Sequence, residues 1–131
     1  MADGNVCEPS EVMIFPCSGA SNWGQISNEV ALMLREAKQG TPYCTAGIGG
    51  HVKPLVENTK KAKVVVALDG CSMGCVKKCL EAEGITPAVY AVISEELGAE
   101  CPKAPERPKE EHVKKAAEKV LPRVENARKG R

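Results

Sequence analysis

The stretch that decides the fold is residues 63–75, Lys-Val-Val-Val-Ala-Leu-Asp-Gly-Cys-Ser-Met-Gly-Cys. Its Val-rich continuous run over 63–68 predicts a strand covered on both faces, as parallel sheets require. Asp69 and Gly70 end that strand, and Ser72 is a candidate N-cap for a helix over 73–83 that Gly84 would close. A buried strand that leads at once into a helix indicates the α/β class.

The same alternation of strands and helices extends outward from this unit in both directions. Apolar patterns predict three more strands, at 11–16, 43–46 (short) and 88–93. Helical spacing of apolar residues predicts helices over 25–39 and 52–61, and the glycines at 47–50 predict a tight turn. A last amphipathic helix follows, in which Pro122 should produce a kink or an interruption. We therefore expect a single three-layer Rossmann-like α/β domain with about four mostly parallel strands in the order 2-1-3-4.

The expected domain organisation has three parts. Residues 1–10 are polar and should be flexible, 11–98 form the α/β metal-binding domain, and 99–131 form a Pro-rich connection and a C-terminal helix on the same domain.

Composition excludes several classes of protein. The chain has 131 residues, of which 43% are hydrophobic and 27% charged, so it is neither disordered nor fibrous. No apolar run approaches the roughly 18 residues of a membrane helix, and the N-terminus lacks a signal-peptide pattern, so we expect a cytoplasmic protein with no membrane partner. The net charge is +1, and although residues 103–131 are basic, charges of both signs alternate there without aromatic residues. No nucleic-acid partner is therefore expected.

Cysteine is the one feature of the composition that indicates function. The chain has seven cysteines, and in a reducing compartment that number favours metal binding or thiol chemistry over structural disulfides. Cys17 and Cys71 each follow the end of a predicted strand, and in the expected order those two strands are neighbours. Cys44 lies near the second strand and Cys75 near a helix start, where a thiolate is favoured. Several thiols should therefore meet at the carboxyl edge of the sheet.

Tetrahedral Zn²⁺ takes four nitrogen or sulfur ligands, and Cys17, Cys44, Cys71 and Cys75 could supply them. Cys79 and His51 are additional ligand candidates. Asp69 is a candidate for a residue that does not bind the metal but orients a ligand by hydrogen bonding. Cys7 and Cys101 look isolated and receive no role.

Three sequence blocks also carry a family pattern. They are Phe-Pro-Cys-Ser-Gly-Ala at 15–20, Cys-Thr-Ala-Gly-Ile-Gly-Gly at 44–50 and Asp-Gly-Cys-Ser-Met-Gly-Cys at 69–75. In this order they resemble the DGC-domain family of small bacterial and archaeal proteins, which is described as zinc-binding on the strength of its cysteines. The resemblance covers roughly residues 11–98 and implies zinc binding by the same four cysteines, Cys17, Cys44, Cys71 and Cys75.

The preferred interpretation is a metal-binding protein, with Zn²⁺ as the ion and its activity unassigned. An iron–sulfur cluster is less favoured, because cysteines four residues apart on a helix suit few clusters. The alternative is a thiol–disulfide redox protein or a thiol-dependent oxyanion enzyme that uses Cys17 with Cys71 or Cys75. The loop after Cys17 loosely resembles that of low-molecular-weight tyrosine phosphatases, but Trp23 stands where their Cys-x5-Arg loop has arginine. That difference argues against the oxyanion version, no catalytic residue is assigned, and whether the chain is an enzyme stays open.

Overall fold

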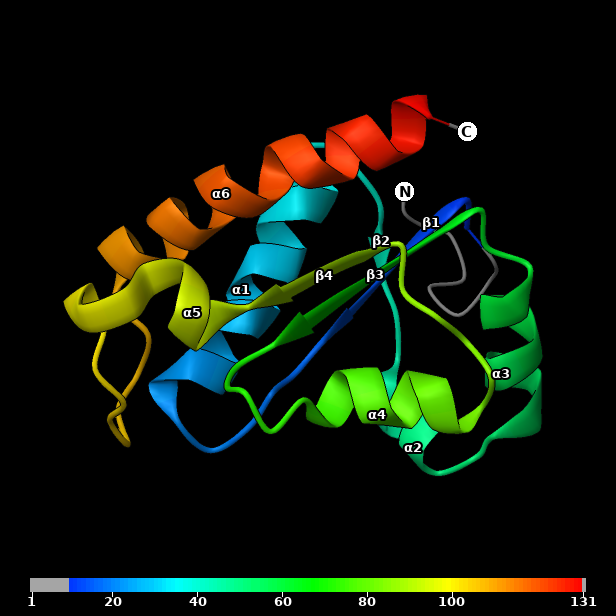
Figure 1. Cartoon of the computed structure of the whole chain (residues 1–131), viewed down its shortest axis with the longest axis horizontal. Coiled ribbons are helices and arrows are strands. Elements are labelled where there is room, and N and C mark those ends of the chain that lie inside the picture. The colour runs from blue at the N-terminus through cyan, green and yellow to red at the C-terminus, as the bar shows by residue number, and fades with distance from the viewer. Residues whose placement is uncertain (1–9, 131) are drawn as a thin grey trace.

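The sheet of the computed structural model, which describes residues 10–130, has four parallel strands. They are β1 (Val12–Pro16), β2 (Thr41–Pro42), β3 (Val64–Asp69) and β4 (Val89–Val92), in the order β2-β1-β3-β4 (Figure 1). The predicted fold class and strand order are confirmed. The order reverses between β1 and β3, so the ends of these two strands frame the crevice where open α/β sheets bind ligands.

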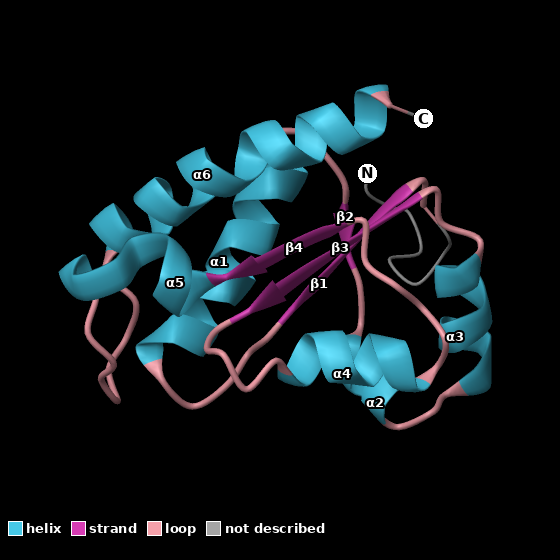
Figure 2. Ribbon diagram, in the orientation of Figure 1, coloured by secondary structure: helices cyan, strands magenta, loops and turns pink. Residues whose placement is uncertain are grey.

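Helices cover both faces of the sheet and give a three-layer arrangement (Figure 2). On one face lie α1 (Asn22–Glu36), α5 (Ile93–Leu97) and α6 (Glu110–Lys129), and on the other lie α2 (Thr45–Gly49), α3 (Lys53–Lys60) and α4 (Cys75–Ala82). A 3₁₀ turn, η1 (Gly98–Glu100), follows α5. The alternating side chains of β1 divide the core between these two layers. Ile14 packs with α1 and α6, whereas Met13 and Phe15 pack with α3 and α4.

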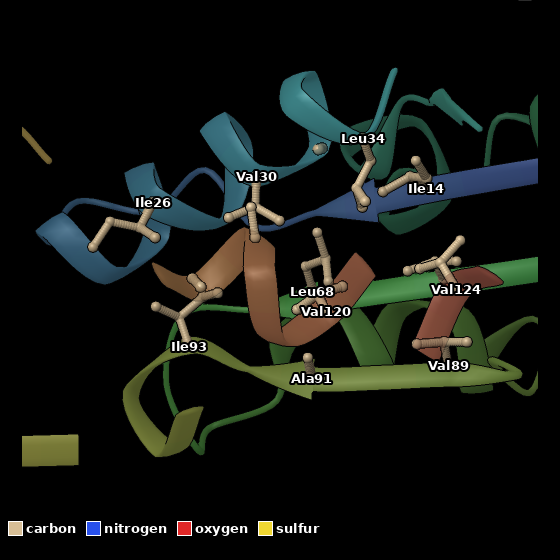
Figure 3. Packing of buried hydrophobic residues seen from close by; sticks show 14 of the residues in the cluster. Ile14, Ile26, Val30, Leu34, Leu68, Val89, Ala91, Ile93, Val120 and Val124 are labelled. Carbon is tan, nitrogen blue, oxygen red and sulfur yellow. The ribbon is translucent and has the colours of Figure 1, made fainter. Parts of the chain in front are cut away.

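The core on the α1 side is built from branched aliphatic residues (Figure 3). Ile14, Val66 and Leu68 of the sheet are fully buried, and Ile26 and Val30 of α1 and Val120 of α6 close over them. The apolar stripe expected of the last helix faces this core, and its buried members are Val113, Ala116, Ala117, Val120 and Val124. This face of the molecule is held by packing and lies opposite the layer that carries most of the cysteines.

The region around the second strand differs from the prediction. The strand occupies Thr41–Pro42 instead of 43–46, and the predicted turn at 47–50 is mostly the short helix α2. Pairing with β1 ends soon after Tyr43, whose N–H donates to the Ile14 carbonyl over 2.8 Å, and the Thr45 hydroxyl then donates to the Pro16 carbonyl over 2.9 Å. This side-chain bond replaces the next step of the ladder and lets the backbone turn into α2. Glycine content predicted a turn here because glycine is a poor helix former.

Helices α1, α5 and α6 also differ from the prediction. Helix α1 starts at Asn22, three residues earlier than expected, and α5 was not predicted at all because its five residues are too short for a periodic pattern. Helix α6 runs continuously through Pro122, so an interruption there is wrong. Pro122 lies on the exposed side of α6, where water can bond the carbonyl that a proline leaves without an N–H partner.

None of the helices within residues 10–130 has the length and apolar character to span a bilayer. The flexible segment predicted at 1–10 lies almost wholly outside the described residues.

Candidate functional site

A cysteine-lined pocket of about 530 Å³ opens at the carboxyl edge of the sheet, on the side of α2 and α4. We call it the cysteine pocket. Its walls come from the loop after β1, the segment from Tyr43 into α2, and one face of α4. The lining residues are Pro16, Cys17, Ser18, Gly19, Asn28, Tyr43, Cys44, Thr45, Ala46, Cys75, Val76 and Cys79. Four cysteines therefore line one hollow, and none of the lining residues has a charged side chain.

Cys17 sits at the base of this pocket, where β1 ends. Its backbone N–H donates to the Leu68 carbonyl over 2.8 Å, which ties it to β3, and its carbonyl accepts from the Ser27 hydroxyl of α1. Burial raises the pKa of the Cys17 thiol, while the backbone N–H groups of Gly70 and Gly19 donate to its sulfur and act in the opposite direction. The negative charges of Asp69 and Cys75 add to the upward shift of that pKa. The sulfur is thus anchored by two amide donors and is a neutral thiol unless a cation arrives.

Asp69 holds the start of α4, which carries Cys75 and Cys79. Its carboxylate is buried and accepts from the N–H of Val76 over 2.8 Å and from the N–H of Lys77 over 3.2 Å. These are two of the donors that a helix N-terminus leaves unpaired. The cap therefore comes from the preceding strand end and not from Ser72, and α4 begins at Cys75, two residues later than predicted.

Tyr90 completes this arrangement and was not predicted from the sequence. Its hydroxyl donates to the Asp69 carboxylate over 2.8 Å from the neighbouring strand β4. Burial, followed by this hydrogen bond, raises the pKa of Tyr90 well above its ordinary value. A polar residue within an apolar strand pattern was the available signal. Tyr90 precedes Val92, the register partner of Asp69, by two positions, so the two side chains share a face of the sheet.

Two glycines bring the loops of the site into backbone contact. A Cβ atom at Gly70 would lie 2.8 Å from the Gly24 nitrogen, and one at Gly24 would lie 2.4 Å from the Gly19 nitrogen. Both contacts involve backbone atoms, which cannot turn aside as a flexible side chain does. The first turn of α1, the loop after β1 and the turn after β3 therefore stack directly, and this stacking directs the Gly19 and Gly70 N–H groups at Cys17.

The remaining candidates lie outside the pocket. Cys71 is partly buried in the turn before α4, and its carbonyl accepts from the Gly74 N–H over 3.2 Å, but it does not line the hollow. His51 is largely exposed and contacts the Glu83 carboxylate. Cys101 is fully buried in the core on the opposite face of the sheet. Cys7 lies outside the described residues.

Comparison with known proteins connects this site to a family. The family model described as "DGC domain" matches residues 13–120. The chain belongs to the DGC-domain family. A curated relative of this DGC domain is the "Anaerobic and virulence modulator AnvM" of Pseudomonas aeruginosa, which is 39% identical over 83 residues. The match spans 63% of this chain and 63% of that relative, so it covers less than two thirds of the relative's length. No solved structure matches the chain.

The three residues of the Asp-Gly-Cys triplet, after which the DGC domain is named, have different structural roles in this fold. Asp69 caps α4, and Gly70 allows the close approach of α1 and donates to Cys17. Cys71 opens the turn that leads into α4, where its carbonyl accepts from the Gly74 N–H. The triplet therefore works mainly by placing other residues of the pocket.

The donor atoms of this DGC domain fit a soft metal ion in kind, because thiolates are ligands that Zn²⁺ prefers. As the side chains stand, no group of three or more His, Cys, Asp or Glu residues within 10–130 is arranged to hold one ion. Cys17, Cys71, Cys75, Cys79 and Cys101 are free thiols. The pocket thus supplies suitable donors without a preformed coordination sphere.

Proposed function

We propose that the chain binds a soft metal ion, Zn²⁺ in the first place, through the thiolates of Cys17, Cys44, Cys75 and Cys79. The observation that carries the proposal is that these four thiols, from three separate segments, line one pocket. Each cysteine side chain turns about a single bond with three staggered positions. The coordination sphere would therefore assemble by rotation of these side chains when the metal arrives, without a change of fold.

This ligand set replaces Cys71 of the sequence-based hypothesis with Cys79. Cys79 lies one turn after Cys75 on the same face of α4, and its sulfur lies beside α2, where a Cβ atom on Gly49 would be 3.2 Å away. Burial raises the pKa of the Cys79 thiol, and electrostatic repulsion from Cys75 raises it further. Cys79 and Cys17 are therefore both neutral thiols before a metal ion binds. Binding of a cation should release their protons to solvent.

Four thiolate ligands would leave no open coordination position. A closed site of this kind is structural or serves storage, whereas a catalytic zinc site keeps a position for water or substrate. The ion would supply a cross-link between α4 and the loops after β1 and β2.

The test is a zinc titration of the full chain against a competing chromogenic chelator, with serine variants of each pocket cysteine. Wild-type protein should bind about one ion per chain, and Cys17→Ser, Cys44→Ser, Cys75→Ser and Cys79→Ser should each weaken binding at least tenfold, about 1.4 kcal/mol. The matched control is Cys71→Ser, a cysteine only four residues before Cys75 that lies outside the pocket, and it should bind as wild type does.

Circular dichroism of each variant separates loss of a ligand from loss of the fold. A wild-type chain that fails to bind zinc contradicts the proposal. Weak binding by Cys71→Ser together with unchanged binding by Cys79→Ser contradicts this ligand set and favours the set that the sequence indicated.

A further inference from the structure

The cysteine pocket differs from a purely structural metal site in being open to solvent. Cys44 and Cys75 are exposed, while Cys17 and Cys79 are partly buried. A hollow of about 530 Å³ is large enough for a small molecule to reach these thiols. Because none of its lining side chains is charged, the pocket offers no cationic partner to an anion. The reagents that suit it are therefore small and neutral, and hydrogen peroxide is the simplest thiol oxidant of that class.

Cys17 is the pocket thiol with two backbone N–H donors at its sulfur, and because burial raises its pKa, its first reaction is slow near neutral pH. The N–H groups of Gly19 and Gly70 donate to its sulfur, so a charge that develops there during attack meets two fixed dipoles. A Cβ atom at Gly19 would lie 3.3 Å from that sulfur, so any other residue at position 19 would crowd it. The same two donors remain available to an oxygen added to the sulfur.

Cys75 is the thiol best placed to react second. It lines the same hollow from the first turn of α4 and is exposed to solvent. A bridge between Cys75 and Cys79 is disfavoured, because side chains four apart on a helix have Cβ atoms about 5–6 Å apart. A disulfide needs a Cβ separation of about 3.5–4.5 Å. Cys17 and Cys75 belong to different elements and carry no such restriction.

We propose that peroxide converts Cys17 and Cys75 into a disulfide, so that the pocket binds metal when reduced and releases it when oxidised. This inference rests on the proposed metal site for its consequence, while the disulfide itself does not require the metal. Removal of two of the four ligand thiols leaves Cys44 and Cys79, which are too few to hold the ion tightly.

The two steps balance in atoms and electrons. The Cys17 sulfur attacks one peroxide oxygen, the O–O bond breaks, and the leaving hydroxide takes the thiol proton and becomes water, which leaves a sulfenic acid on Cys17. The Cys75 sulfur then attacks the Cys17 sulfur, the S–O bond breaks, and the departing hydroxide takes the Cys75 proton. Two thiols and one peroxide give one disulfide and two waters. The sulfurs lose the two electrons that the peroxide oxygens gain.

The experiment treats full-length, metal-free protein with one equivalent of hydrogen peroxide and maps its peptides by mass spectrometry. Wild type should lose two reactive thiols per chain, yield a linked peptide pair that contains Cys17 and Cys75, and regain both thiols with dithiothreitol. Cys75→Ser should form no such link and should keep a sulfenic acid on Cys17 that dimedone traps. Cys101→Ser, which lies in the opposite core, is the matched control and should behave as wild type does.

A second measurement follows zinc release from loaded protein with a chromogenic chelator during peroxide treatment. Release should accompany the disulfide in wild type and should slow at least tenfold in a Cys17→Ser variant that has first been loaded with zinc. A link between other cysteines, or an unmodified Cys17, overturns the proposal even if zinc binds. A Cys17–Cys75 disulfide in a protein that never binds zinc would instead sustain the oxidation and contradict the metal site.

Discussion

At the scale of the residue, Cys17 shows two opposing influences on a single thiol. Burial raises its pKa, and the N–H groups of Gly70 and Gly19 act against burial without overcoming it. Since the thiolate is the nucleophile, the net upward shift makes Cys17 less reactive near neutral pH than an unperturbed cysteine. The same two donors hold the sulfur in place while the thiol stays protonated.

The raised pKa predicts how alkylation of Cys17 depends on pH. In the folded, metal-free chain the rate of reaction with iodoacetamide should reach half its maximum at a higher pH than in the urea-unfolded chain, because the folded thiol ionises later as pH rises. Peptide-resolved mass spectrometry from about pH 6 to about pH 10 measures both curves around the ordinary cysteine value. Equal midpoints in the two states would contradict the buried position of the sulfur.

At the scale of the element, helix α4 depends on contacts at its first turn more than on its own sequence. The helix has only eight residues, its N-cap position is Gly74 with no capping side chain, and two of its first N–H groups are bonded by Asp69 of β3. Gly74 adopts φ +68°, a left-handed conformation that costs other residues roughly 1–2 kcal/mol. The entry to the helix that carries Cys75 and Cys79 is therefore set by strand β3 and by one glycine.

Alanine substitutions at Gly74 and Gly84 separate the effect of backbone strain on stability from the effect of the turn before α4 on zinc binding. Gly74→Ala and Gly84→Ala should each lower the free energy of unfolding by roughly 1–2 kcal/mol, because both glycines have positive φ. A Cβ atom at Gly74 would lie 3.4 Å from the Tyr90 hydroxyl, whereas nothing lies within 4 Å of one at Gly84. Only Gly74→Ala should also weaken zinc binding. Urea unfolding and the chelator titration measure the two effects, and equal zinc binding by both variants would refute the dependence of the site on this turn.

At the scale of the whole molecule, the sheet separates two hydrophobic cores, and the cysteine pocket adjoins only one of them. The core with α1, α5 and α6 is aliphatic, and Cys101 is fully buried within it. The core with α3 and α4 includes Phe15 and Tyr43, whose rings meet edge to face at 5.8 Å between centroids, and Cys17 and Cys79 pack against it. Damage to the two cores should therefore affect the site differently.

A matched pair of leucines tests this division. Leu34 of α1 and Leu80 of α4 are both almost fully buried, one in each core. Leu34→Ala and Leu80→Ala should each lower the free energy of unfolding by about 2–5 kcal/mol through the cavity they leave. Only Leu80→Ala should weaken zinc binding under conditions where both variants remain folded, since it adjoins Cys79. A similar loss of zinc affinity in both variants would mean that the site responds to overall stability alone.

The sequence alone determined the α/β class, the strand order and the edge of the sheet at which cysteines gather. Apolar runs such as 64–68 indicate burial on two faces. The strand ends that follow from such runs place Cys17 and the turn after Asp69 at the same edge of a parallel sheet, and the order 2-1-3-4 makes their strands neighbours. These inferences need only local pattern and general rules of connection. The three motif blocks likewise led to the family, because they depend on order along the chain.

The tertiary structure alone decided which thiols share the pocket. Cys79 lines it and Cys71 does not, since Cys71 lies in a non-periodic turn whose direction follows from the packing of Gly70 on Gly24 and from the hydrogen bonds of Asp69 with α4. Tyr90 joins Asp69 across neighbouring strands from 21 residues away. Contacts of this kind set the start of α4 and the shape of the turn. The spacing of cysteines cannot predict these contacts, because they join atoms that are distant in sequence.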